Sequence, residues 1–424
     1  MYQFFRSTFF NFETIRILST APFGGADIAE SLEAIGQIKD NDPDGWHRAW
    51  LAQAEKAEAL GEDAVHTGNY EEARRAYLRA SNYFRASAYM WNDRPQSPDP
   101  RVLPAAERVV STFRKAIPFF NSPVHLLEIP YGEHTLPAYL FIPSELQRLP
   151  GKTPVLINTG GADSLPEELY YIYGASGPRL GYAVLIFEGP GQGAVLRRHR
   201  LPMRPDWEAV TSQVLDYLFE YASIHPDLKL DTDRVAIAGA SMGGYFALRA
   251  ASDHRFKACV AIDPFYDMWD FATYHLSPIF LWSWSQGWLS DKWVNHILRL
   301  ISALVFQLRW EVNVSGWFFG LNTPSETLQE MKLYTLKNGF LANVRTPVLV
   351  SGAAHSLYFN PIHHTMSVYD GLVNLSEDQK HVWIPSLASE GGLQAKVGAF
   401  GISTQRTFSF LDEVFGVVRE RLQN

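Results

Sequence analysis

The sequence is poor in cysteine and has no excess of positive charge. Cys259 is the only cysteine among 424 residues, which excludes an internal disulfide and favours a reducing, cytoplasmic location. It lies within an apolar stretch, so we expect it to be a small buried core residue. Lys and Arg number 37 against 45 Asp and Glu, and the net charge of −8 argues against a nucleic-acid partner.

Long uninterrupted apolar runs are also missing. The N-terminal stretch is aromatic, but Arg6, Asn11 and Glu13 interrupt it, so it lacks the apolar region of a signal peptide. The most apolar stretch is 293–310. Polar and charged residues such as Arg299 occur in it too often for a bilayer-spanning helix of about twenty apolar residues. We therefore expect no export signal, no stable membrane insertion and an amphipathic helix over 293–310.

The N-terminal part of the chain has the apolar spacing of helices. The segments with this spacing are 46–65, 70–86 and 102–116. Gly68 and the proline-rich stretch 94–100 separate them. The pattern predicts an all-helical domain over 46–120, preceded by an N-terminal extension over 1–45.

After residue 120 the apolar period changes to two, and strands alternate with helices. The expected strands cover 124–130, 136–143, 154–158, 183–187, 234–238, 258–262, 347–351 and 380–385. This alternation predicts an α/β fold with a mostly parallel sheet and helices on both faces. The strand rhythm stops between 266 and 343, where tryptophans crowd, so we expect a helical cap there, inserted between two parts of the core, 121–265 and 344–424.

A Gly-x-Ser-x-Gly motif lies between the expected strand 234–238 and a helix. This arrangement is typical of the nucleophile elbow of the α/β-hydrolase fold, whose strained turn lifts the Ser241 hydroxyl clear of the sheet. The N–H of Met242, directly after the nucleophile, is then a candidate oxyanion donor. Gly160 and Gly161 follow an earlier strand and could supply a second donor. An ordinary glycine turn is the alternative at both places.

Several motifs together make the chain resemble one α/β-hydrolase family. They are Asn158-x-Gly-Gly-x-Asp-Ser-x-x-Glu-Glu-Leu-Tyr170, Phe187-Glu-Gly-Pro-Gly-Gln-Gly193, Arg204-Pro-Asp-Trp-Glu208, Gly239-x-Ser-Met-Gly-Gly-Tyr245 and Tyr77-Leu-Arg-Ala-Ser-Asn-Tyr83. The family contains the dihydroxypseudooxynicotine hydrolases, which cleave a carbon–carbon bond next to a carbonyl, and fungal hydrolases of pigment and other polyketide pathways. The resemblance covers residues 46–265 closely. It implies a helical domain folded against the hydrolase core, a Ser nucleophile and a carbonyl substrate such as a polyketide.

The chain departs from this family at the other two positions of the catalytic triad. Where the family has its Asp, in a Gly-x-x-Asp-His pattern, this chain has His355. Where the family has its His, the best match is Gln394, and no histidine follows His381. An amide cannot accept a proton at neutral pH, so the ordinary route to an activated Ser241 is closed unless another base replaces the missing imidazole.

Three other histidines, His355, His363 and His364, could replace the missing base, although a loop histidine is more often a surface or packing residue. Asp263, at the end of a strand on the same edge, could orient such a histidine, but it fits a capped turn equally well.

The expected pocket is apolar. The tryptophan-rich insertion suggests an aromatic roof, and Asp163, Trp282, Trp284 and Trp288 are the candidate substrate-binding residues. A cap core that packs on itself would also explain the tryptophans.

Three functions are compatible with these residues. In the first, Ser241 attacks a carbonyl of a polyketide or polyketide–peptide and His355 serves as base. In the second, the pocket and oxyanion hole promote cyclisation, condensation or elimination without acyl transfer. In the third, the protein binds a ligand and is catalytically silent. Each requires an apolar small molecule, none requires a cofactor or a metal, and a homodimer is left open.

Overall fold

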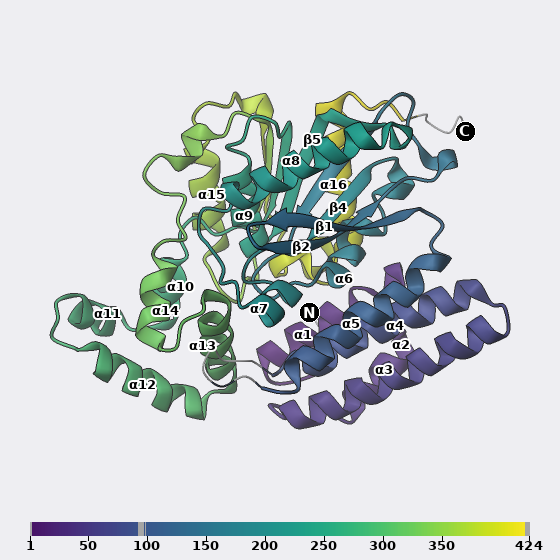
Figure 1. The fold of residues 1–424 in the computed structure, drawn as a ribbon. Coiled ribbons are helices and arrows are strands. Elements are labelled where there is room, and N and C mark those ends of the chain that lie inside the picture. The colour runs from purple at the N-terminus through teal and green to yellow at the C-terminus, as the bar shows by residue number, and fades with distance from the viewer. Residues whose placement is uncertain (1, 92–96, 98, 420–424) are drawn as a thin grey trace.

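The computed structural model describes residues 2–91, 97 and 99–419. It consists of a helical N-terminal part, a core built on a sheet and a helical cap (Figure 1). Much of the proline-rich break expected at 94–100 lies outside the described residues. No helix in the described ranges combines the length and hydrophobicity that a membrane crossing requires.

The N-terminal part consists of α-helices that lie under the sheet in Figure 1. They are α1 (Thr8–Leu18), α2 (Ile28–Gly36), α3 (Pro43–His66), α4 (Tyr70–Ala88) and α5 (Val102–Ala116). The predicted break at Gly68 is confirmed, and the Asn69 side chain caps α4 by accepting a hydrogen bond from the N–H of Glu72. The sequence suggested no element for the extension 1–45, but α1 and α2 lie within it. The Phe9 and Phe10 side chains of α1 are fully buried with Trp46 and Trp50.

The sheet has eight strands in the order β1-β2-β4-β3-β5-β6-β7-β8. They are β1 (Val124–Tyr131), β2 (His134–Phe141), β3 (Thr153–Thr159), β4 (Ala183–Phe187), β5 (Leu230–Ala240), β6 (Ala258–Ile262), β7 (Val348–Ser351) and β8 (Lys380–Trp383). The β1–β2 hairpin is antiparallel, and so is the β2–β4 pair. The other neighbours are parallel. Each predicted strand is present. Cys259 is fully buried in β6, as expected.

Helices cover both faces of the sheet. The core helices are α6 (Pro166–Leu169), α7 (Gly193–His199), α8 (Glu208–Ile224), α9 (Met242–Ala250), α15 (Pro361–Gly371) and α16 (Phe400–Phe415). Side chains of α8, α9 and α15 share one apolar cluster with Val155 and Ile157 of β3. Leu156 of the same strand points to the other face, where it joins side chains of α16 and of the N-terminal helices. The N-terminal helices therefore complete the core on this second face.

The cap lies between β6 and β7. Its helices are α10 (Trp269–His275), α11 (Pro278–Ser285), α12 (Asp291–Leu304), α13 (Phe306–Phe319) and α14 (Pro324–Met331). The prediction of one amphipathic helix over 293–310 was wrong, because Val305 adopts extended dihedrals and separates α12 from α13. This break turns α13 toward the N-terminal helices, where Trp310 packs on Phe9.

Candidate functional site

Ser241 lies at the turn between β5 and α9 with a φ of 57° and a ψ of −120°. A non-glycine residue adopts such dihedrals only at a cost of about 1–3 kcal/mol, so the surrounding structure must enforce them. Two glycines permit the tight turn. A Cβ on Gly239 would lie 2.1 Å from the carbonyl oxygen of Gly243, and a Cβ on Gly243 would lie 2.7 Å from that of Thr159. The local geometry is that of the predicted elbow.

A pocket opens beside Ser241, and four parts of the chain border it. They are α1 and the end of α4, the ends of core strands with the segments that follow them, α10, α13 and α14 of the cap, and the loops around residues 358 and 394–400. Ser241 and Met242 both border it, and so does Gly161. Met242 is the first residue of α9, where the N–H has no partner within the helix. This N–H is therefore free of a helical partner, and its role as an oxyanion donor stays a prediction.

The glycine loop after β3 is less open than the sequence suggested. The N–H of Gly161 donates to Ser164 Oγ at 3.0 Å, so a ligand oxygen must displace this hydroxyl to reach it. Gly160 is not among the residues that border the pocket, and its carbonyl accepts from Gln192 Nε2 at 2.9 Å. Sequence reasoning missed both partners. The signal that could have identified Ser164 is its place three residues after Gly161, because serine hydroxyls often form hydrogen bonds with backbone groups of the same turn.

No hydrogen bond joins Ser241 Oγ to an imidazole within the described residues. His355 is exposed and does not border the pocket, and its backbone N–H donates to the carbonyl of Gly392. His363 is also exposed. His364 is buried, its Nδ1 accepts from the N–H of Tyr266 at 3.0 Å, and burial lowers its pKa to about 4. The structure therefore brings none of the candidate bases to Ser241.

Gln394 does reach the pocket, and it lies 4% exposed against the end of β6. Its Nε2 donates to the backbone carbonyl of Asp263 at 3.1 Å. An amide donates here but cannot take a proton from a serine hydroxyl at neutral pH. The position matched to the family's His thus holds a hydrogen-bond donor.

Asp263 is paired with a lysine, not with a histidine. Lys396 Nζ lies 2.7 Å from Asp263 Oδ1 and donates to the carbonyl of Gly352 at 3.0 Å. Ser351 Oγ donates to the same carboxylate oxygen. Lys396 is fully buried, and this burial lowers its pKa. The suggestion that Asp263 orients a histidine is wrong, because an ammonium occupies that side of its carboxylate. Sequence reasoning missed Lys396, which carries no local signal of burial.

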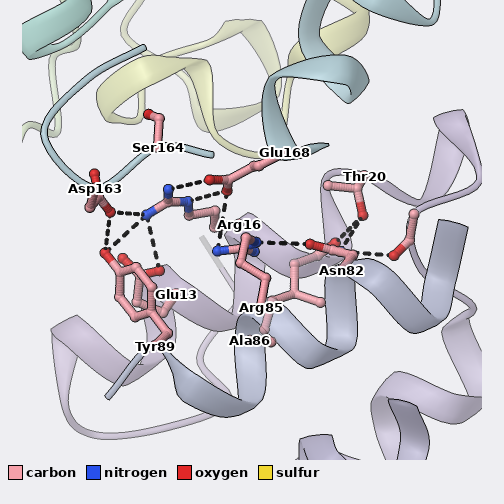
Figure 2. A network of polar contacts seen from close by, with 12 residues as sticks. Glu13, Arg16, Thr20, Asn82, Arg85, Ala86, Tyr89, Asp163, Ser164 and Glu168 are labelled. Carbon is pink, nitrogen blue, oxygen red and sulfur yellow. Dashed lines mark hydrogen bonds and ion pairs between the residues drawn. The ribbon is translucent and has the colours of Figure 1, made fainter. Parts of the chain in front are cut away.

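Asp163 borders the pocket as predicted, but it belongs to a polar network with the N-terminal helices (Figure 2). Arg16 of α1 donates through Nη1 to Asp163 Oδ2 at 2.7 Å, and through Nε and Nη2 to both carboxylate oxygens of Glu168 at 2.6 Å. The hydroxyl of Tyr89 also donates to Asp163 Oδ2. Asp163 is half-buried, and Arg16 and Tyr89 keep its pKa below the usual range. It is therefore a permanent anion of the site.

The predicted tryptophan roof is wrong for the three residues named. Trp282 and Trp288 are 50% and 75% exposed and contact each other, and Trp284 donates from Nε1 to Asp291 inside the cap. None of the three borders the pocket. The cap residues that border the pocket lie on or directly before α10, on α13 and on α14. They are Met268, Phe271, Trp310, Glu311, Val314, Ser315, Phe318 and Met331.

Similar proteins place the chain in a family. The prolyl oligopeptidase family model matches residues 177–306. Hydrolyase ccsE of Aspergillus clavatus is 54% identical to this chain, with 100% of each chain covered. The chain belongs to this family of fungal hydrolases. Hydrolyase poxO of Penicillium oxalicum is another relative, 53% identical with 99% of this chain and 100% of that protein covered.

A solved structure supports the same fold. The crystal structure of the 2,6-dihydroxy-pseudo-oxynicotine hydrolase matches with a TM-score of 0.71 at 18% identity, with 96% of this chain and 98% of that chain covered. The fold is that of an α/β-hydrolase with a helical N-terminal part. The predicted resemblance to fungal hydrolases is confirmed by the two relatives with more than 50% identity. As a member of the family, the chain is a hydrolase-class enzyme.

Proposed function

We propose that this enzyme acts in the cytoplasm on an apolar, carbonyl-rich polyketide or polyketide–peptide intermediate of fungal secondary metabolism. The pocket supports this substrate class because aromatic and aliphatic side chains such as Phe265, Trp310 and Phe318 form most of its wall. The carbonyl would lie at the elbow, where the N–H of Met242 can stabilise negative charge on its oxygen.

For the reaction itself, the site favours cyclisation or condensation over acyl transfer. The observation that carries this proposal is the environment of Ser241 Oγ, which has no imidazole within hydrogen-bond reach among the described residues. Without a base, a serine hydroxyl is a poor nucleophile. Orientation of a flexible substrate and stabilisation of a developing oxyanion can still accelerate bond formation within one molecule.

Hydrolysis through Ser241 is the second candidate. It is favoured by the strained dihedrals of Ser241, which the surrounding turn still enforces, and by the hydrolase family of the chain. In this case a base would have to approach Ser241 when substrate binds, with His355 as the candidate.

Labelling with an alkyl fluorophosphonate distinguishes the two candidates, because this reagent reacts with activated serine hydroxyls. We expect the wild-type protein to gain no more label than Ser241→Ala, as measured by intact mass, and His355→Ala to behave like the wild type. Stoichiometric labelling of Ser241 that is lost in His355→Ala would instead establish hydrolysis. A ligand that binds tightly while no product forms from any pathway intermediate would indicate a silent binding protein.

A further inference from the structure

A second polar region of the pocket lies at α1, away from the motifs that identified the elbow. Glu13 borders the same pocket as Ser241, although its side chain is only 3% exposed. Its Oε2 lies 3.4 Å from Arg16 Nη1. Its Oε1 is buried and has no hydrogen-bond partner within the described residues. A buried carboxyl oxygen without a partner is costly, and a ligand that supplies one would relieve that cost.

Arg16 does not neutralise Glu13, because its guanidinium is already engaged. Two of its hydrogen bonds go to Glu168 at 2.6 Å, and Nη1 donates to Asp163 at 2.7 Å and to the Tyr89 hydroxyl at 2.9 Å. Figure 2 shows these contacts converging on Arg16, with Glu13 on the same side as Tyr89. The 3.4 Å contact with Glu13 is the longest of the set.

The charges of this cluster leave one carboxyl in excess. The cations are Arg16 and Arg85, and the anions are Glu13, Asp163 and Glu168, with Arg85 Nη1 3.3 Å from Glu168. Protonation of one carboxyl would make the cluster neutral. Asp163 and Glu168 hold the short contacts to Arg16, so the proton belongs on Glu13. Burial raises the pKa of Glu13 to about 7, which agrees with this assignment and lets both protonation states exist near neutral pH.

The other groups that face Glu13 do not compete for this proton. The pKa values of the Tyr89 and Tyr358 hydroxyls are raised by burial and by the neighbouring carboxylates, so both stay neutral. Glu311 of α13 is the remaining carboxyl of the pocket, and burial raises its pKa to about 7 as well. Its Oε1, however, accepts a hydrogen bond from Gln307 Nε2 at 2.8 Å.

The acidic region and the elbow are joined by one short loop. Asp163, which Arg16 holds, is two residues after Gly161, so at most about 7 Å of chain separates them. Gly161 borders the pocket with Ser241 and Met242. A substrate whose carbonyl lies at the elbow can therefore reach toward Glu13 within the same pocket.

We propose that Glu13 is the proton-transfer residue of this enzyme, which removes a proton from the carbon next to the substrate carbonyl. The C–H bond breaks, an O–H bond forms on the Glu13 carboxylate, and the electron pair moves into an enolate. The enolate oxygen then carries its negative charge beside the N–H of Met242. Return of the proton from Glu13 closes the cycle without an oxidant or a further reactant. This step rests on the proposed function in one respect, that the substrate carbonyl lies at the elbow.

Hydrogen–deuterium exchange tests the step directly. The probe is acetoacetanilide, a 1,3-dicarbonyl amide, incubated with the full-length protein in D2O, and loss of its methylene signal is followed by proton NMR. We expect the wild-type protein to accelerate exchange and Glu13→Gln to lose about 100-fold of that acceleration, the usual size of a general-base contribution. Gln keeps an acceptor for Arg16 but cannot titrate. Glu13→Asp, which can, should recover part of the rate.

The pH profile and the controls separate this role from a structural one. The wild-type rate should rise through a single ionisation near pH 7, and that ionisation should disappear in Glu13→Gln. The surface control Glu220→Gln should keep the wild-type rate. Exchange that survives in Glu13→Gln and is lost in Glu311→Gln would assign the role to Glu311 and overturn the proposal. Wild-type protein that gives only the background rate would also overturn it.

Fluorophosphonate labelling decides the proposed function independently. Labelling of Ser241 would show that its hydroxyl is activated, and the proposed reaction without acyl transfer would fail. If exchange still depends on Glu13 in that case, the proton-transfer role of Glu13 stands. If Ser241 stays unlabelled and Glu13→Gln exchanges normally, the role of Glu13 fails and the proposed reaction stands.

Discussion

At the scale of single residues, the pocket contains ionisable groups whose charge depends on what surrounds them. Asp163 and Glu13 both lie near Arg16, but the short contact to Arg16 lowers the pKa of the half-buried Asp163, while burial raises that of Glu13. Lys396 and Asp263 pair behind the pocket wall, where the ammonium takes a place that a triad would give to a histidine. Two carboxyls of one cluster therefore have opposite roles, one as a fixed anion and one as a carrier of a proton.

The raised pKa of Glu13 makes the stability of the protein depend on pH. The folded state holds the proton up to about pH 7, whereas the unfolded chain releases it near pH 4.5. This stabilisation is complete below pH 4.5 and is lost as the pH rises to about 7. At about 1.4 kcal/mol per pH unit, the total is about 3 kcal/mol.

Urea denaturation of wild-type and Glu13→Gln proteins at pH 5, 6, 7 and 8 measures this effect. The free energy of unfolding of the wild type should fall relative to that of Glu13→Gln between pH 5 and 7, and the difference should then level off. Other buried carboxyls contribute equally to the pH dependence of the free energy of unfolding of both proteins, so they do not affect this difference. Curves that stay parallel over this range would show that Glu13 titrates normally.

At the scale of elements, the turn between β5 and α9 depends on close packing around its glycines. The carbonyl of Gly243 approaches the Cα of Gly239 so closely that any side chain would collide with it. The turn also places Met242, the first residue of α9, beside the pocket. The elbow therefore keeps its strained backbone although no hydrogen bond joins its serine to an imidazole among the described residues.

Gly239→Ala should destabilise the protein by about 1–3 kcal/mol, the usual cost of overpacking a close contact. The matched control is Gly401→Ala in α16, where an added Cβ meets nothing within 4 Å. This control should be neutral or stabilising by up to about 1 kcal/mol, because alanine favours helix. Thermal unfolding of both variants measures the difference. Equal melting temperatures would contradict the packing argument.

At the scale of the whole molecule, the pocket is closed by segments far apart in the chain. Arg16 in α1 bonds to Asp163 and Glu168 in the core, at sequence separations of 147 and 152. Trp310 of the cap donates to the backbone carbonyl of Tyr89 at the end of α4. Residues 1–45 thus form part of the wall of the site, although the sequence suggested only an extension.

Arg16→Met should destabilise the protein by about 3–5 kcal/mol, because Asp163 and Glu168 would lose the cation that compensates their burial. The control Arg75→Met removes an exposed arginine that pairs with Glu71 on α4. Such surface pairs contribute less than about 1 kcal/mol, so this variant should melt like the wild type. Thermal unfolding gives the comparison, and limited proteolysis should cut near α1 sooner in Arg16→Met. Wild-type behaviour of Arg16→Met would show that α1 is held by its aromatic side chains alone.

The strands, the helices between residues 46 and 116, the mostly parallel sheet and the elbow at Ser241 could be predicted from the sequence. These features depend on local patterns, such as alternating apolar residues in β3, the break at Gly68 and the glycines around Ser241. It also showed that no histidine follows His381.

The surroundings of Ser241 could not be predicted from the sequence and became visible only in the folded protein. Contacts between distant segments pair Lys396 with Asp263 and bring Glu13 to the pocket. They also keep Trp282 away from the pocket. Such contacts leave no periodic signal in the chain, and the burial that raises the pKa of Glu13 exists only after α1, the core and the cap have packed together.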